Sequence, residues 1–126
     1  MSQSPGHRKW PEHRVHEQPI EQRVRALVLG DVIAESTDVI RVEEDGHPPR
    51  YYFPRADVNM DALESTDRST ECPFKGTARY FTLRAGSVRL EDVAWTYEQP
   101  YDEHKRLRGR IAFHDEKMPQ IRVEMG

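Results

Sequence analysis

The stretch TARYFTLRAGSVRLEDVAWTY, residues 77–97, decides the fold class of this chain. In its first half, alternate residues from 78 to 83 form two sets, Ala-Tyr-Thr and Arg-Phe-Leu. Ala85 and Gly86 then interrupt the pattern, and Val93, Trp95 and Tyr97 share one face of an extended chain. Successive side chains of a strand point to opposite faces. The stretch therefore predicts two antiparallel strands joined by a tight turn.

Shorter runs of the same kind lie on both sides of this hairpin. Residues 24–28 and 32–34 are separated by Gly30 and Asp31, which predicts a second tight hairpin. Further strand-like runs with turn residues between them occupy residues 39–43, 51–53, 110–114 and 120–125.

Two segments depart from the strand pattern. Residues 55–67 fit either a short helix capped by Asp57 or one turn followed by a brief strand, and we favour the second. Residues 101–109 are polar and predict a short helical turn or loop. Eight or so short strands without a long amphipathic helix indicate an all-β, mainly antiparallel fold.

The amino-terminal segment has a different composition. Residues 1–19 contain three prolines and three histidines and few aliphatic side chains. Such a segment has little apolar surface to bury. We therefore expect residues 1–19 to form a poorly structured arm and residues 20–126 to form a single β domain.

Charge and cysteine content exclude several classes of function. The net charge of −3 gives no electrostatic reason to expect binding to nucleic acid or to an anionic membrane. The chain has one cysteine, so an internal disulfide and a cysteine-cluster zinc site are excluded. No segment resembles a signal peptide or a membrane helix. We expect a cytoplasmic protein with no metal and no cofactor.

Four motifs together resemble a known family. They are RYYFP at 50–54, CPFKG at 72–76, AWTY at 94–97 and GRIAF at 109–113. In this order and at this spacing they are similar to the bacterial family catalogued as domain of unknown function 427, over roughly residues 13–126. The CPFKG element is the most specific of the four.

The resemblance implies a compact β domain of the Mss4-like or β-tent type. In that architecture two antiparallel sheets lean together at a steep angle, and relatives include zinc proteins, B-type methionine sulfoxide reductases and the drug-binding domain of cereblon. Many of them carry two Cys-x-x-Cys zinc knuckles. This sequence has neither knuckle, so the resemblance implies the fold without the structural zinc. Function does not follow from fold alone.

A nucleotidyltransferase-like label is also attached to this family, and the residues do not support it. Polymerase-type nucleotidyl transfer needs two neighbouring carboxylates that share metal ions. After Gly86 and Ser87, the acids are the adjacent Glu91 and Asp92, which would point to opposite faces of a strand. The chain also has no P-loop.

Cys72 and Lys75 are the candidate catalytic residues. A nucleophilic cysteine needs a nearby cation or histidine, and Lys75 could approach Cys72 if Pro73 and Phe74 form a turn. The alternative is a cysteine that only packs in the turn, as most free cysteines do, and we favour it. Lys75 itself is placed to bind a carboxylate or phosphate, or else is an exposed turn lysine.

Aromatic residues give the strongest ligand-binding signal. Seven of them lie in strands that should be neighbours, and alternate residues on adjacent strands line one face. They could form the wall of a pocket for a planar or cationic small molecule, or they could simply form the core. We expect the ligand-binding residues to be Tyr52, Arg55, Lys75, Trp95 and Tyr97.

Other polar residues give weaker signals. The acids Asp57, Asp61, Glu64 and Asp67 could hold a divalent cation, but a solvated loop is the commoner arrangement. The histidines show no metal-binding spacing, and we expect surface positions for His13, His16, His47, His104 and His114.

The sequence supports three classes of function. We favour a domain that binds a small molecule without catalysis. The alternatives are a small enzyme that uses Cys72 or Lys75, and a structural protein whose arm docks on a partner. The sequence does not predict an oligomeric state.

Overall fold

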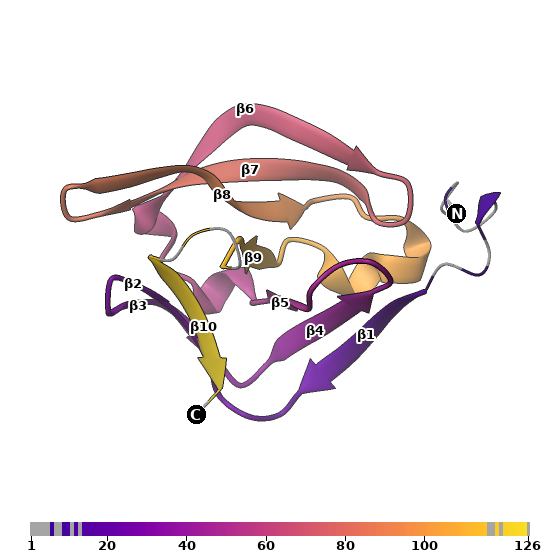
Figure 1. The fold of residues 1–126 in the computed structure, drawn as a ribbon, viewed down its shortest axis with the longest axis horizontal. Helices are drawn as coiled ribbons and strands as arrows, with labels where there is room; N and C mark the ends of the chain where they lie inside the picture. The colour runs from indigo at the N-terminus through magenta and orange to yellow at the C-terminus, as the bar shows by residue number, and fades with distance from the viewer. Residues whose placement is uncertain are drawn as a thin grey trace.

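The hairpin predicted at residues 77–97 forms the centre of the largest sheet. In the computed structural model, which describes residues 6, 9, 10, 12, 14–115, 118 and 120–125, β7 (Gly76–Ala85) pairs with β8 (Val88–Tyr97). β6 (Leu63–Cys72) and β9 (Ile111–Phe113) complete the sheet in the order β6-β7-β8-β9. All its strand pairs are antiparallel, and β6 to β8 form the upper layer in Figure 1.

Two three-stranded sheets lie on the other side of the core. One has the order β1-β4-β5, from β1 (Val15–Ile20), β4 (Val39–Glu44) and β5 (Arg50–Tyr52). The other has the order β10-β2-β3, from β2 (Val24–Val28), β3 (Asp31–Ser36) and β10 (Ile121–Met125). These pairs are also antiparallel, which confirms the predicted all-β, mainly antiparallel fold.

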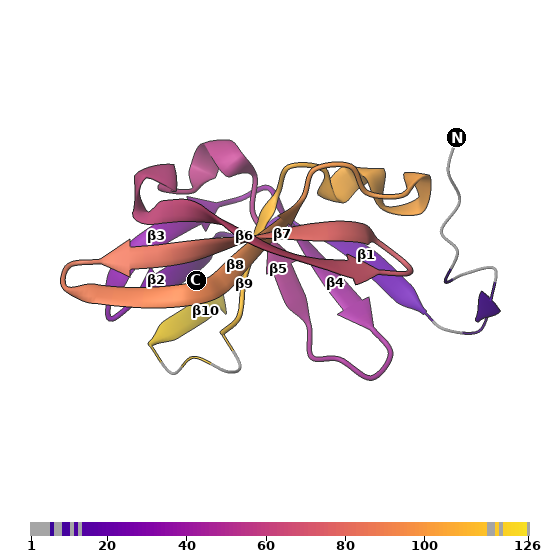
Figure 2. The same ribbon diagram turned by 90° about the horizontal axis from the view of Figure 1, so that it is seen from above.

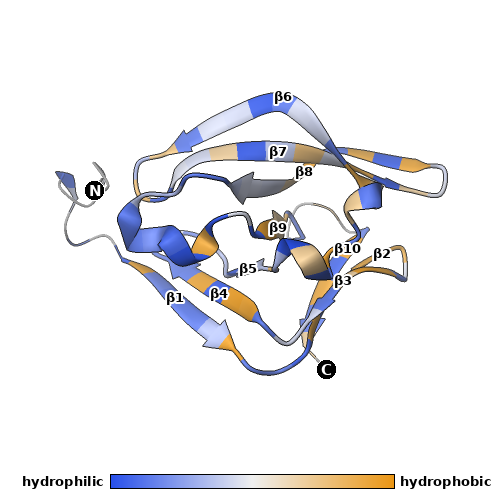
Figure 3. Cartoon of the chain, turned by 180° about the vertical axis from the view of Figure 1, so that it is seen from behind, coloured by the Kyte–Doolittle hydropathy of each residue, from blue (hydrophilic) through white to orange (hydrophobic). Residues whose placement is uncertain are grey.

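Short 3-10 helices connect the strands along one side of the molecule (Figure 2). They are η1 (Arg55–Asp57), η2 (Met60–Ala62) and η3 (Asp102–Leu107). The turn favoured at residues 55–67 is present as η1 and η2, but the strand that follows is ten residues long rather than brief. The length of β6 could not be predicted from the alternation of apolar and polar residues. β6 is an edge strand and is polar along most of its course (Figure 3).

The apolar interior is divided into two clusters. The larger cluster contains Phe53, Phe81, Leu83 and Phe113, together with residues of β2 and β3. The smaller contains Tyr52, Trp95, Tyr97 and Leu107, with residues of β4. Phe53 joins the lower layer to the upper one, because its backbone exchanges hydrogen bonds of 2.8 and 2.9 Å with Ile111.

The amino-terminal boundary differs from our expectation. We expected little regular structure up to residue 19, but residues 15–19 belong to β1, which pairs with β4 along its whole length. Val15 and Ile20 pack against the two apolar clusters. Glu17 lies 2.5 Å from Nδ1 of the buried His104. These contacts with distant elements fix a strand that local composition does not predict.

Part of the arm before β1 contacts the CPFKG turn. The backbone N–H of Gly6 donates to the carbonyl oxygen of Pro73 at 2.7 Å. The rings of Trp10 and Phe74 lie 6.3 Å apart. His13 lies outside the described residues. Within the described part of the chain, no helix is long and apolar enough to cross a membrane.

Candidate functional site

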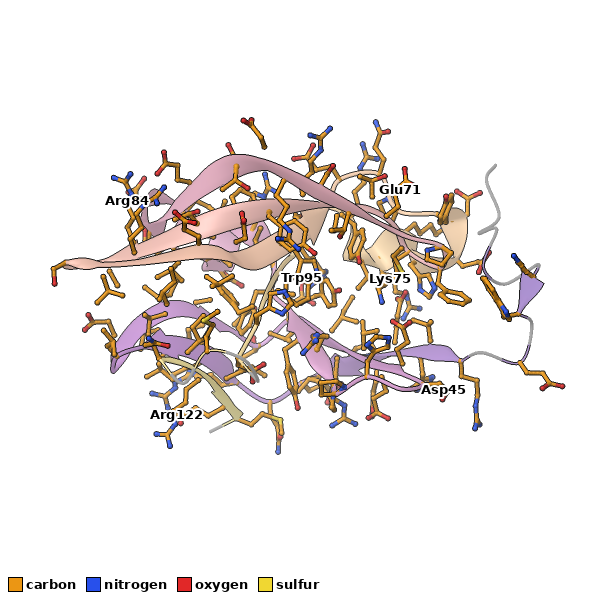
Figure 4. All side chains as sticks on the ribbon, turned by 45° about the horizontal axis from the view of Figure 1, so that its top comes forward. Asp45, Glu71, Lys75, Arg84, Trp95 and Arg122 are labelled. Atoms are coloured by element: carbon orange, nitrogen blue, oxygen red, sulfur yellow. The ribbon has the colours of Figure 1, made fainter. Side chains whose placement is uncertain are left out.

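A cavity of about 220 Å³ opens between the upper sheet and the strands β4 and β5. Four of the five residues predicted to bind a ligand line it, and so does Cys72. These residues are Tyr52, Lys75, Trp95 and Tyr97. Figure 4 shows Trp95 and Lys75 in the space between the two layers. The structure thus brings together side chains from β5, β8 and the turn between β6 and β7.

The floor of the cavity is aromatic and almost completely buried. Tyr52 is 1% exposed, and Trp95 and Tyr97 are each 5% exposed. The indole Nε1–H of Trp95 donates to the Tyr52 hydroxyl at 3.0 Å, with the rings edge to face at 6.2 Å. The Tyr97 ring lies 6.3 Å from that of Tyr52. These three residues therefore act both as core and as the base of the cavity.

Burial changes the ionisation of the two tyrosines. It raises the pKa of Tyr52 well above the ordinary value for tyrosine, although the hydrogen bond from Trp95 acts in the opposite direction. Burial also raises the pKa of Tyr97, and the neighbouring Tyr52 and Cys72 add to the effect. Both hydroxyls are consequently neutral at physiological pH and offer hydrogen bonds rather than charge.

An ion pair forms one wall of the cavity. Lys75 Nζ donates to Glu44 Oε1, with the two side chains 9% and 11% exposed. His47 Nε2 lies 3.8 Å from the other Glu44 oxygen. Glu44 ends β4, whereas Lys75 lies in the turn before β7. The pair therefore links the two layers at the cavity.

The conformation of the CPFKG turn explains how Lys75 reaches this position. Gly76 has φ of +123°, which side-chain-bearing residues rarely adopt. The Lys75 carbonyl accepts a hydrogen bond of 3.0 Å from the Tyr101 N–H. The turn is thus fixed from both sides, and the lysine is directed inward instead of being an exposed turn residue.

Half-buried side chains surround the mouth of the cavity. The Arg50 guanidinium lies 5.5 Å from the Trp95 ring centroid. The His114 ring lies 4.3 Å from Trp95 and is stacked at 6.4 Å against Tyr80. The Tyr80 hydroxyl is 2.9 Å from Thr70 Oγ1. The mouth therefore combines flat rings with a cationic group.

Cys72 lies at the end of β6 and is half-buried. It packs against the smaller apolar cluster while also lining the cavity. Its position thus combines packing contacts with a place beside the cavity.

Arg55 is not part of this cavity. Its Nε donates to the Gly109 carbonyl at 3.2 Å, and its guanidinium lies 5.9 Å from the Phe81 ring centroid. It lines a separate cleft together with Arg106, Arg108 and Arg110. The prediction that Arg55 shares a pocket with Tyr52 and Trp95 was wrong, because η1 turns the chain away from the cavity directly after β5.

Two of the histidine assignments were also wrong. His104 is buried rather than on the surface, because η3 carries it inward to Glu17. His114 is half-buried against Trp95. His16 and His47 are exposed, as expected.

The run of acids between η1 and β6 makes separate local contacts. Asp57 accepts a hydrogen bond of 2.6 Å from the Ser36 hydroxyl, and Glu64 pairs with Arg84 at 2.9 Å. Among the described residues, no group of three or more His, Cys, Asp or Glu side chains is arranged to hold a metal ion.

Sequence reasoning missed Glu44 and Arg50 as site residues. They flank a turn. Glu44 lies outside the four motifs, and Arg50 is only the first residue of RYYFP. A weak signal was available, because Tyr52 was expected to face a pocket and Arg50 lies two residues before it on the same strand face. Glu44 gave no such signal, since its partner Lys75 is 31 residues away.

The chain belongs to the family described as Domain of unknown function (DUF427), whose model, named NTP_transf_9, matches residues 16–124. This match confirms the family indicated by the four motifs. No curated protein matches the chain.

Proposed function

We propose that this protein is a β domain that binds a small molecule in the cavity between β4, β5 and β8. The observation that carries the proposal is the convergence of Tyr52, Lys75, Trp95 and Tyr97 on one enclosed space. A concave site with an aromatic base and a few fixed polar groups is the usual form of a ligand pocket. The same four residues are among the ligand-binding candidates that the sequence predicts.

The cavity restricts the kind of ligand. Its volume of about 220 Å³ is below the roughly 300–1,000 Å³ of pockets for drug-sized molecules. The ligand would therefore be a small metabolite or a single modified side chain. Flat walls formed by Trp95, His114 and Tyr80 favour a planar group. Donors at Lys75 and Arg50 and an acceptor at Glu44 favour polar groups at its edge.

We also propose the Mss4-like or β-tent architecture and a cytoplasmic location. Two layers of antiparallel strands around one interior support the first, and a single cysteine supports the second. Superposition of an experimental structure on β-tent domains would test the architecture. Fractionation of cells that express a tagged chain would test the location.

Ligand binding can be tested first by native mass spectrometry. Protein purified gently from a cell extract would be compared with the same protein after denaturation. An added mass of a small organic molecule in the native spectrum is the expected result. Fragmentation of the released species would identify the ligand.

Fluorescence of Trp95 gives a second, site-specific test. The Trp10→Phe variant leaves Trp95 as the sole tryptophan, so its emission reports on the cavity floor. A ligand found by mass spectrometry should change this emission in a saturable manner. The Lys75→Met variant should weaken the binding, whereas Lys105→Met, which removes an exposed lysine in η3, should not. Equal effects of both variants would contradict the proposed site.

A second candidate function is catalysis by Cys72. The observation that favours it is the position of the half-buried sulfur beside the same cavity. Lys75 is a weaker candidate, because its ammonium is held against Glu44. The alkylation rate of Cys72 as a function of pH separates the two functions. An alkylation midpoint well below the ordinary thiol pKa of about 8.5 would favour an enzyme, whereas a thiol that reacts only on denaturation would exclude Cys72 from chemistry.

A further inference from the structure

A second concave surface is lined by an unusual concentration of arginines. It is a cleft of about 720 Å³ between η1 and the loop that follows η3. Four of its eight lining residues are arginines, and one is a glutamate. The arginines are Arg55, Arg106, Arg108 and Arg110. This grouping occurs in a chain whose net charge is −3, so it opposes the average charge of the molecule.

Two of the arginines are positioned by neutral acceptors. Arg55 Nε donates to the carbonyl of Gly109 at 3.2 Å. Arg110 donates through Nε to the carbonyl of Arg106 at 3.0 Å and through Nη1 to the carbonyl of Asp38 at 2.6 Å. Backbone carbonyls orient a guanidinium without neutralising it.

Few carboxylates balance the charge of these arginines. Arg110 Nη2 lies 3.5 Å from the Asp38 carboxylate oxygens, at the limit of a hydrogen bond. Within the described part of the chain, no ion pair is formed by Arg55, Arg106 or Arg108, or by Glu98, the acid that lines the cleft. The cleft therefore has a net positive charge that the protein itself leaves largely uncompensated.

The backbone around the cleft is held in place. Gly109 has φ of +72°, and its N–H donates to the Tyr97 carbonyl at 2.9 Å. Arg108 also forms an isolated parallel bridge with Tyr97. Ile111, two residues after Gly109, exchanges hydrogen bonds with Phe53. The loop that presents the arginines is thus tied to β8 and to the end of β5, so the cleft is preformed.

We propose that this cleft binds the phosphate groups of a small molecule that carries two or more of them. Arginine presents several N–H groups in a planar fork that matches phosphate oxygens, and such charge-assisted hydrogen bonds are the strong ones. Several arginines around one space suit a polyvalent anion better than a single carboxylate. The volume of the cleft lies within the usual range for small-molecule sites.

The cleft is distinct from the aromatic cavity. Tyr97 lines the cavity and the next residue, Glu98, lines the cleft. β8 ends at Tyr97 and the chain bends at Glu98. The two sites have no lining residue in common, so failure of one proposal does not imply failure of the other.

Titration calorimetry with inorganic pyrophosphate tests the proposal. The titrations would be carried out at one ionic strength, on the full chain and on an Arg106→Gln/Arg108→Gln double variant. Both arginines are exposed, so the variant should fold. We expect saturable binding to the native chain and a loss in affinity of about tenfold or more in the variant.

The matched control is Arg84→Gln/Arg89→Gln, which makes the same change in net charge elsewhere. Arg84 pairs with Glu64 and Arg89 with Glu91, and Figure 4 shows Arg84 at one end of the upper sheet. We expect pyrophosphate binding in this control to match the native chain. Absence of saturable binding at millimolar pyrophosphate, or equal weakening in both double variants, would overturn the proposal. Tighter binding of a single-stranded oligonucleotide than of pyrophosphate would overturn the proposal, because the cleft would then bind nucleic acid instead of a small molecule.

Discussion

Lys75 and Glu44 form an ion pair between the CPFKG turn and the end of β4, and both side chains are about nine-tenths buried. Pairs of this kind are costly to break, because the remaining charge loses its partner while staying out of water. The pair therefore has two roles here. It connects the two layers of strands, and it fixes the polar wall of the aromatic cavity.

Removal of one member of this pair should destabilise the fold strongly. We expect Lys75→Met or Glu44→Gln alone to lower the free energy of unfolding by about 3–5 kcal/mol. The Lys75→Met/Glu44→Gln double variant should lose less than the sum of the two, because both buried charges are then absent. Urea denaturation of the four proteins gives these values.

The control for this cycle is the exposed pair Arg84 and Glu64, 2.9 Å apart on the outer surface of the upper sheet. Water and salt screen such a pair, so Arg84→Gln should lower the free energy of unfolding by less than about 1 kcal/mol. Similar losses for Arg84→Gln and Lys75→Met would show that the buried pair has no special role.

The two buried tyrosines of the cavity floor should differ in their response to loss of the hydroxyl. Tyr52→Phe removes the acceptor of the Trp95 Nε1–H and leaves a buried donor unpaired. We expect a loss of about 1–3 kcal/mol in the free energy of unfolding. Tyr97→Phe is the matched control, because the Tyr97 hydroxyl makes no hydrogen bond to a described side chain. Tyr97→Phe should lower the free energy of unfolding clearly less than Tyr52→Phe, as measured by the urea midpoint. Equal losses would contradict the assigned hydrogen bond.

Gly76 should tolerate no side chain. Its φ of +123° lies outside the left-handed region that asparagine accepts, and a Cβ would lie 3.3 Å from the Gln99 carbonyl oxygen. We expect Gly76→Ala to lower stability by about 1–3 kcal/mol. It should also weaken ligand binding, because the turn positions Lys75.

A control for Gly76 is available in the turn between β4 and β5. Gly46 has φ of +82° and would place a Cβ in open space. Gly46→Asn should therefore lower the melting temperature less than Gly76→Ala, because it adds backbone strain without a steric contact. A Gly76→Ala variant as stable as Gly46→Asn would mean that the CPFKG turn can adopt another conformation.

The strands of this fold could be predicted from sequence where one face is buried. Val93, Trp95 and Tyr97 alternate with residues of different character, and the turn at Gly86 separates two well-marked runs. The sequence does not predict β1 and underestimates the length of β6, for the opposite reason. Both are mostly polar edge strands that are fixed by pairing with distant partners, β4 and β7.

The candidate site could be predicted from sequence only where its residues lie in strands. Tyr52, Trp95 and Tyr97 could be assigned to one space because strand periodicity determines which face each occupies. Glu44 could not, because its position beside Lys75 depends on how two layers meet. Arg55 was wrongly assigned to the cavity because a single 3-10 turn after Pro54 changes the direction of the chain. Periodicity does not predict the direction of a chain after such a turn.

The buried tyrosines should also limit stability at high pH. Burial raises the pKa of Tyr52 and Tyr97 above the ordinary tyrosine value of 10.0. Above pH 10 the unfolded chain releases protons that the folded chain keeps, so the unfolded state is favoured as pH rises. Below pH 10 these two groups are protonated in both states and contribute no pH dependence. The free energy of unfolding should therefore fall by up to about 1.4 kcal/mol per pH unit for each tyrosine above pH 10.

Urea denaturation between neutral and strongly alkaline pH measures this slope, with tyrosinate absorbance followed in parallel. The Tyr52→Phe and Tyr97→Phe variants should each have a shallower slope than the native chain, because one linked proton is removed. Tyr101→Phe is the control, since Tyr101 is half-buried outside the cavity, and it should keep more of the native slope. A native slope that is unchanged in both cavity variants would show that Tyr52 and Tyr97 ionise as readily in the folded protein as in the unfolded chain.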